Sequence, residues 1–284
     1  MQYTTAKTLI DIQGGLKLAR NPHWFDQELL FVDIHDRRIM SCNLSGELRT
    51  VTALPFIPGS FDVLDVGGLL VGNAWRRKIY QCDSTGQSQV ADISSITKVC
   101  LSGSVLDSRG GMYVGDFGFD HLDPTVDPTP TGLIVHVNVR GESSVVARDL
   151  FSPRGMIITP DNSSLIVAET LAHRLTAFEI AQDGSLRNRT VWAQFQNDMR
   201  PDGICLDLDG AVWVAGMGPS ALHVYEGGDI DHQVATERSV IGVTLGGPEQ
   251  KHLFLCTSIE CDPVITRRHP DATIDVAEVN IPSA

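Results

Sequence analysis

The sequence predicts an all-β fold, a six-bladed β-propeller, on three observations. Short runs of β-branched and aromatic residues recur along the whole chain of 284 residues. Each run follows a turn that contains Gly, Asp or Asn, and roughly 40–50 residues separate one run from the next, which is the spacing of propeller blades. No stretch shows a sustained helical period, and an alternation of strands with helices is missing. A pair of β-sandwiches is the alternative that this pattern leaves open.

Six runs mark one expected strand in each blade. They are 29–34 (LLFVDI), 69–74 (LLVGNA), 111–116 (GMYVGD), 165–170 (LIVAET), 211–216 (AVWVAG) and 253–258 (LFLCTS). Most of them lead into a second strand and another turn, as residues 37–47, 77–87, 174–186 and 222–229 do. We expect the alternating residues 273–281 to share a blade with residues 8–12 and so to close the ring of blades. The whole chain, 1–284, is then predicted to be a single propeller domain.

Composition and charge restrict the class of partner. Hydrophobic residues make up 42% of the chain, which is enough for a folded core. The 22 Lys and Arg against 35 Asp and Glu give a net charge of −13. Because nucleic acids and anionic lipids bind clustered basic residues, we expect neither nucleic acid nor a membrane as partner. A small-molecule ligand is the expectation that remains, and nothing in the sequence points to an oligomeric state.

Cysteine usage and the first residues suggest a compartment. The six cysteines fall singly along the chain, without a CxxC pair, which is typical of reduced thiols. The first residues have no basic segment followed by an apolar one, and no apolar run approaches the length of a membrane span. We therefore expect a cytoplasmic protein.

The repeat also supplies a register for a candidate site. Counting eight residues back from one turn residue in each blade should reach the point where the chain enters its innermost strand. The six positions found in this way are Arg20, Gly59, Ser102, Arg154, Asp202 and Gly242. We expect them to converge on one axial ring, where the two glycines leave room and the four polar residues form a site. The alternative is a structural Arg–Asp network that plugs the channel.

Several stretches around these positions carry a family resemblance. They are 111–120 (GMYVGDFGFD), 152–170, 173–193 and 200–215, the last beginning RPDG. With them, nearly the whole chain resembles the family of senescence marker protein (regucalcin), gluconolactonase and luciferin-regenerating enzyme. The resemblance implies a six-bladed propeller, lactonase activity, and one divalent cation in an axial funnel. It also implies four ligands for that cation: a Glu of an EGP motif, Asn residues of ND and PNG motifs, and an Asp of a PDG motif.

The implied cation site is not preserved in this chain. At the four matching positions stand Arg20, Ser102, Arg154 and Asp202, so that only the Asp survives. Arginine stays protonated and has no lone pair to give a metal, and each Arg would repel a divalent cation. Asn21 could replace one ligand and hold a residual metal with Asp202, but it does not restore the other two positions. We therefore predict that the metal is lost and that no cofactor is bound.

A metal-free enzyme is the function that these residues favour. Arg20 and Arg154 would bind a carboxylate or a developing oxyanion, and Asp202 would act as general acid and base in the hydrolysis of a lactone or ester. A metal-free lyase, isomerase or cyclase is the first alternative, by resemblance to strictosidine-synthase-like propellers. A non-catalytic ligand-binding propeller, in which the arginines form salt bridges with Asp202, is the second.

Further residues are expected at the substrate. Ser102 belongs to the predicted ring, and His23 follows Arg20 closely. Asp116, Asp120 and His121 lie where the third blade leaves its strand and enters the Pro-rich segment 121–132. This segment is either a lid over the funnel or a plain connecting loop.

Overall fold

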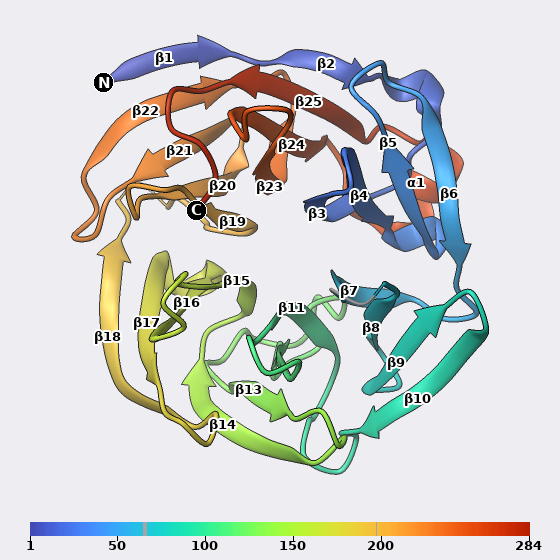
Figure 1. Ribbon diagram of the computed structural model, residues 1–284, viewed down its shortest axis with the longest axis vertical. Coiled ribbons are helices and arrows are strands. Elements are labelled where there is room, and N and C mark those ends of the chain that lie inside the picture. The colour runs from blue at the N-terminus through green and yellow to red at the C-terminus, as the bar shows by residue number, and fades with distance from the viewer. Residues whose placement is uncertain (65–66, 197) are drawn as a thin grey trace. The chain divides into compact units, whose positions relative to one another are not determined.

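The fold is almost entirely β, as the sequence predicts. We describe a computed structural model, which covers residues 1–64, 67–196 and 198–284. In these residues the strands form six sheets, five of four strands and one of five (Figure 1). The helical segments among them are short: α1 (Pro263–Arg268) and the 3-10 turns η1 (Ile12–Gly14), η2 (Ile34–Asp36) and η3 (Thr170–Ala172). The six blades of an all-β propeller are therefore confirmed.

The chain divides into two compact units of three blades each. Residues 1–55 and 193–284 form the first unit, and residues 56–192 form the second. The single domain expected from the sequence stays a prediction, and the two units are described one by one.

In the first unit, both ends of the chain contribute to the sheets. The first sheet has the order β3 (Ala19–Phe25), β4 (Glu28–Asp33), β5 (Arg38–Cys42) and β6 (Leu48–Ala53). The second has the order β19 (Ile204–Leu206), β20 (Val212–Gly218), β21 (Ser220–Val224), β22 (Ile230–Ala235) and β1 (Gln2–Thr5). The third has the order β23 (Ser239–Gly246), β24 (His252–Ser258), β25 (Thr273–Glu278) and β2 (Lys7–Ile10). The antiparallel pairing of β2 with β25 confirms the shared blade, whereas the parallel pairing of β1 with β22 was not expected.

The second unit repeats one four-stranded meander three times. Its first sheet comprises β7 (Pro58–Val63), β8 (Leu69–Asn73), β9 (Lys78–Asp83) and β10 (Gly86–Asp92). Its second comprises β11 (Leu101–Leu106), β12 (Met112–Asp116), β13 (Gly132–Val137) and β14 (Ser143–Leu150). Its third comprises β15 (Pro153–Ile158), β16 (Ser164–Glu169), β17 (Arg174–Ile180) and β18 (Leu186–Gln194).

The turns that set the register have left-handed backbone. Gly110 and Gly210, which end the first hairpin loop of two blades, have φ of 78° and 83°. Asn162 and Gln250 take the same place in two others, with φ of 58° and 57°. Because Gly and Asn adopt this conformation most easily, the turn signals seen in the sequence have a direct structural cause.

A bulge interrupts the first strand of most blades at the predicted ring position. The pairing of β3 with β4 shifts register between Arg20 and His23, and that of β15 with β16 shifts between Pro153 and Met156. Similar shifts occur in β7, β11 and β23. A bulge places extra residues on one strand and turns a side chain away from the regular pleat. The first strand of each of these blades can therefore present a polar side chain outside the packed sheet.

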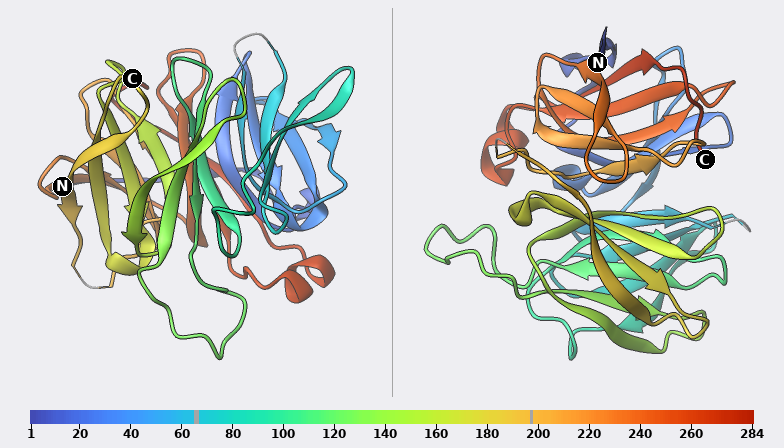
Figure 2. Two further views of the ribbon diagram at one scale, coloured as in Figure 1. Left: turned by 90° about the horizontal axis from the view of Figure 1, so that it is seen from below. Right: turned by 90° about the vertical axis from the view of Figure 1, so that its left-hand side faces the viewer.

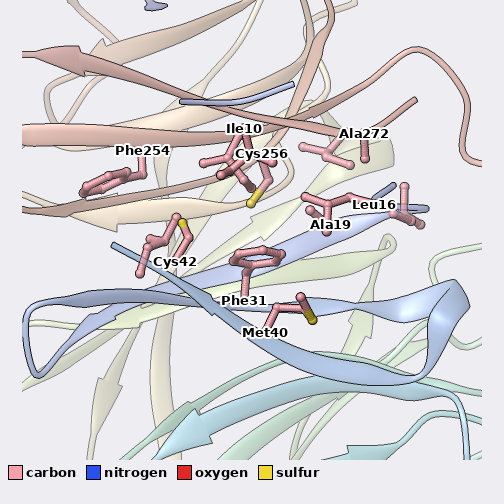
Figure 3. Packing of buried hydrophobic residues seen from close by; sticks show 13 residues of the cluster. Ile10, Leu16, Ala19, Phe31, Met40, Cys42, Phe254, Cys256 and Ala272 are labelled. Carbon is pink, nitrogen blue, oxygen red and sulfur yellow. The ribbon is translucent and has the colours of Figure 1, made fainter. Parts of the chain in front are cut away.

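Apolar side chains from neighbouring blades fill the space between the sheets. One cluster in the first unit joins β3, β4 and β5 to β24, with Phe31, Phe254 and Cys256 buried at its centre (Figure 3). Ile10 of β2 and Ala272 extend the same cluster. In the described part of the chain, no helix has both the length and the hydropathy needed to cross a bilayer.

Candidate functional site

A buried ion pair joins two of the predicted ring residues in the first unit. Arg20 is the second residue of β3, and Asp202 lies just before β19. Arg20 Nη1 donates a hydrogen bond to Asp202 Oδ2 at 2.7 Å, and the two side chains are 13% and 4% exposed. Burial alone would lower the pKa of Arg20, but the neighbouring Asp202 carboxylate and Cys261 thiol raise it above its ordinary value. The guanidinium therefore remains a permanent charge in this site.

Backbone contacts hold Asp202 in its place. Its N–H donates to the carbonyl of Ala215 at 2.8 Å, and the Ala215 N–H donates to the carbonyl of Gly203 at 2.9 Å. A Cβ on Gly203 would lie only 2.7 Å from the Cα of Gly242, so glycine is required where β23 passes. The ProAspGly sequence thus combines a fixed carboxylate with a close approach of the next blade.

Two polar residues of the bulge after Arg20 contact each other, and Cys261, which follows β24, contacts Arg20. Asn21 has a left-handed backbone (φ 52°), and its Nδ2 atom lies 2.8 Å from His23 Nε2. Exposed Cys261 lies within hydrogen-bonding reach of the Arg20 guanidinium. The structure therefore groups Arg20, Asp202 and Cys261, and His23 forms a hydrogen bond with Asn21. The contact between Cys261 and Arg20 arises only in the fold, because the two residues are far apart in the chain.

In the second unit, Arg154 belongs to a stack of rings. Arg154 is the second residue of β15, and its guanidinium carbon lies 4.8 Å from the ring centroid of Phe117. Phe117 packs on His121 at 4.4 Å, and His121 stacks on Trp75 at 6.3 Å. A cation over an aromatic face is held by the ring quadrupole, and a row of rings offers a flat apolar surface to a ligand. Trp75 was missed by sequence reasoning, since a Trp followed by two arginines is typical of a solvated face.

Ser102 occupies the corresponding place on the neighbouring strand. It is the second residue of β11, is buried, and its hydroxyl has no hydrogen-bond partner among the described residues. A Cβ on Gly103 would overlap the carbonyl of Arg154, so this glycine lets β11 and β15 run side by side. Gly59 similarly lies against Leu101. The predicted positions of this unit therefore follow one another across adjacent first strands.

Asp116 joins two loops through backbone hydrogen bonds. It is fully buried, and its carboxylate accepts hydrogen bonds from the backbone N–H groups of Lys98, Val99 and Gly118 at 2.7–3.1 Å. Burial raises the pKa of Asp116, and these hydrogen bonds oppose the rise. The side chain fixes two loops, and a substrate contact by Asp116 stays a prediction.

The other residues near this loop lie at its edge. Asp120 Oδ1 accepts a hydrogen bond from the Leu122 N–H at 3.0 Å, which closes a local turn. His121 is exposed and lies in the long loop between β12 and β13, residues 117–131, which Figure 2 shows in green, extending beyond the strands that it joins. A substrate contact by Asp120 or His121, and a lid formed by this loop, stay predictions. So does the convergence of the ring residues of the two units on one axis.

The residues at the four matching positions do not fit the family's cation. The Asp202 carboxylate is bound by a guanidinium instead of a metal, and Arg154 lies over an aromatic ring. Neither Arg has an oxygen to offer to a divalent cation. Across residues 1–64, 67–196 and 198–284, no three His, Cys, Asp or Glu side chains are grouped as metal ligands would be. Loss of the metal remains a prediction, and we derive no step through a metal.

Comparison with known proteins decides the family. The family model described as SMP-30/Gluconolactonase/LRE-like region matches residues 18–259. The chain belongs to this family. Among solved structures, a luciferin-regenerating enzyme superposes with a TM-score of 0.82 at 16% identity, over 98% of this chain and 97% of that one. A calcium-binding regucalcin from Agrobacterium tumefaciens superposes with a TM-score of 0.81 at 16% identity, over 100% and 97%. These likenesses confirm the propeller fold.

Curated relatives of the family are distant in sequence. Regucalcin of Danio rerio is 23% identical over 70% of this chain and 68% of its own length. A 6-deoxy-6-sulfogluconolactonase of Pseudomonas putida is 24% identical over 86% and 84%. The lactonase drp35 of Staphylococcus haemolyticus is 27% identical over 52% of this chain, and the alignment spans only 45% of that relative.

Proposed function

We propose that this family member hydrolyses a lactone or ester of a small molecule without a metal. Membership of a family whose relatives include lactonases supports the reaction class. The observation that carries the proposal is the buried pair of Arg20 and Asp202, in which a fixed positive charge stands at a family metal position. The location is proposed to be cytoplasmic, and the substrate a small molecule.

The proposed chemistry uses one carboxylate twice. Asp202 takes a proton from a water molecule, whose oxygen attacks the carbonyl carbon of the substrate. The guanidinium of Arg20 binds the oxyanion that forms, in the role that a cation would otherwise take. When the tetrahedral intermediate collapses, the ring C–O bond breaks, and the departing alkoxide receives the proton from Asp202. The product is a hydroxy acid.

Arg154 is proposed as the second anion-binding residue. Arg154 belongs to the second unit, so its role does not rest on a contact with Arg20 or Asp202. The role is inferred from the register of the repeat and from the family motif position that Arg154 occupies. Its guanidinium carbon lies 4.8 Å from the Phe117 ring centroid, and a guanidinium can bind a carboxylate or oxyanion through two N–H groups. Ser102, with a buried hydroxyl that no described residue engages, is proposed as a further hydrogen-bonding group for the substrate.

A non-catalytic ligand-binding role is the second candidate. The same Arg20–Asp202 ion pair is what this alternative expects, because a buried pair can serve structure alone. A lyase or another metal-free reaction would use the same residues but would not add water to the product.

The test is turnover on a panel of γ- and δ-lactones of sugar acids, measured as the release of protons by the acid product. We expect turnover that persists after dialysis against EDTA, with one oxygen from labelled water in the product. Asp202→Asn should lower kcat by roughly 100-fold or more, and Arg20→Met by a similar factor, because each removes a group that acts in the transition state.

A second Arg–carboxylate pair in the same blade supplies matched controls. Arg49 and Glu28 form an exposed pair at 2.5 Å, so Arg49→Met and Glu28→Gln should leave turnover unchanged. Loss of activity on EDTA treatment would contradict the metal-free mechanism. Absence of turnover on every lactone, together with stabilisation of the fold by a lactone, would favour the ligand-binding candidate.

A further inference from the structure

A small pocket in the first unit lies apart from the proposed catalytic pair. Its volume is about 390 Å³, and it is lined by Lys17, His35, Asp36, Arg37 and Arg267. This volume is within the usual range for small-molecule sites, but the lining is charged where most such sites are apolar. The pocket is distinct from the Arg20–Asp202 pair because neither residue of that pair lines it, although the charge of Arg20 is close enough to act on His35.

The pocket is built by contacts between two helical turns. The ring of His35, in η2, lies with Nδ1 2.6 Å from Thr266 Oγ1 of α1, and both residues are buried. The Thr266 hydroxyl donates to the carbonyl of Asp262 at 3.0 Å, so its oxygen accepts the proton of His35 Nδ1. Arg267 Nε donates to the carbonyl of His35 at 3.3 Å. The walls are therefore fixed by the protein itself.

This arrangement leaves His35 as an acceptor. Burial and the charges of Arg267 and Arg20 lower the pKa of His35 to about 4, so its ring is neutral near pH 7. With the proton on Nδ1, the Nε2 atom carries a lone pair, and no described residue donates to it. A ligand hydroxyl can donate a hydrogen bond to this nitrogen.

The charges of the lining are not balanced. Asp36 is its one carboxylate, and it is already bound by Lys17 at 2.6 Å and by Arg38 at 3.2 Å. Arg37 acts electrostatically on Asp36, and Asp262 acts on His35, but no described carboxylate forms an ion pair with Arg37 or Arg267. Both arginines are exposed and hydrated, and an anion bound between them would be attracted by both charges. This excess of positive charge is local, since the whole chain carries −13.

We propose that this pocket binds a small oxyanion, a phosphate, sulfonate or carboxylate group, through Arg37 and Arg267, with His35 accepting a hydrogen bond from a ligand hydroxyl. Guanidinium groups match the geometry of such anions. The anion is either a free ligand or one end of a larger molecule whose other end reaches Arg20. The pocket has this role whether or not the Arg20–Asp202 pair is catalytic.

Titration calorimetry with inorganic phosphate at constant ionic strength tests the proposal. We expect saturable binding at millimolar or lower concentration. The double variant Arg37→Asn and Arg267→Gln should weaken it at least tenfold, and Asn suits the left-handed backbone of Arg37 (φ 54°). Arg268→Gln is the matched control, because Arg268 is exposed on the same helix but does not line the pocket. It should bind phosphate as the wild type does.

Two results would overturn the proposal: no saturable binding of phosphate by the wild type, or equal binding by the wild type and the double variant. The single variant Arg267→Gln, outside the left-handed turn, keeps the test valid should the double variant unfold. Binding of 6-phosphogluconate separates the two sources of the anion. If the site takes a free anion, 6-phosphogluconate should bind with the same affinity as inorganic phosphate. If the site takes one end of a larger molecule, 6-phosphogluconate should bind more tightly than phosphate, and Arg20→Met should remove that gain.

Discussion

At the scale of single residues, Asp62 links a buried carboxyl group to the stability of the second unit. It lies in β7 and is only 4% exposed, and the Ser104 hydroxyl of β11 donates to its Oδ2 at 2.5 Å. Burial raises the pKa of Asp62 to about 7, although hydrogen bonds from Ser104 and the Leu106 backbone oppose the rise. The folded state therefore keeps a proton that the unfolded state releases near pH 4.

It follows that Asp62 destabilises the fold as the pH rises. Its contribution is most favourable below pH 4 and is lost progressively up to about pH 7, by on the order of 4 kcal/mol. Asp62→Asn should remove this dependence. We expect the free energy of unfolding of the variant, relative to wild type, to increase between pH 4 and pH 8 in urea titrations, so that the variant becomes relatively more stable. A difference that does not change with pH would contradict the assignment.

Residues of the candidate site differ in how far the sequence could predict them. Arg20 and Asp202 were found because the repeat sets their register, and the structure joins them in an ion pair. The backbone contacts of Asp116 were not predicted, because its carboxylate accepts from the amides of Lys98 and Val99, whose position depends on a loop and not on a pattern. Cys261 reaches Arg20 only through the fold.

At the scale of elements, an Asp–His pair recurs with the same register in two blades. Asp207 accepts from the backbone N–H groups of Asp209 and Ala211 in the β19–β20 turn, and its Oδ2 lies 2.6 Å from His223 Nε2. His223 stands opposite Trp213 in the pairing of β21 with β20. In another blade Asp107, His136 and Tyr113 repeat this arrangement. The pair ties the first turn of a blade to its third strand.

Removing the Asp should therefore weaken the blade as a unit. Asp207→Ala leaves two backbone N–H groups and His223 without their acceptor, and we expect a loss of about 3 kcal/mol in the free energy of unfolding. Burial opposes charge on His223, but hydrogen bonds to Asp207 and Asp231 prevail and raise its pKa. The stability from this charge is complete below pH 6.5 and is lost as the pH rises through the folded pKa, so the loss in the variant should be larger at pH 6 than at pH 9.

The neighbouring Asp209→Asn is the control for this variant. Asp209 is exposed in the same turn, and its substitution should change stability by less than about 0.5 kcal/mol. Equal effects of the two substitutions, measured by urea unfolding, would show that the Asp–His contact does not stabilise the blade.

Buried strands were easier to predict from the sequence than exposed or irregular ones. The second strand of each blade is a continuous apolar run, such as β8 and β12, and was visible in the sequence. The outer strand β10 is mostly exposed and polar, so no apolar pattern marks it. The first strands, such as β3 with its Asn and Pro, are interrupted by bulges and have weak strand signals. The helix α1 has six residues, which is too short for a periodic pattern.

At the scale of the whole molecule, the chain joins its two ends into blades. The alternation of residues 273–281 predicted the partner of the first strands, and β2 pairs with β25 in the sheet that also holds β23 and β24. The parallel addition of β1 to β22 could not be predicted, because Gln2–Thr5 is exposed on the edge of an already complete sheet and has no burial pattern. Closure by β2 combines its pairing with β25 and the half-buried Leu9 with one fully buried apolar contact.

Ile10 is that contact, and its removal tests how firmly β2 is held. Its side chain is 4% exposed and packs in the cluster of Phe31, Phe254 and Cys256. Ile10→Ala should cost about 2–4 kcal/mol, because it deletes buried methyl groups and leaves a cavity between blades. Ile12→Ala, at a position 51% exposed, should be nearly neutral. Urea unfolding measures both, and hydrogen exchange of the β2 amides should quicken only in the first variant. Should the two variants behave alike, β2 is not docked in the core, and β23–β25 would have to be stable without their fourth strand.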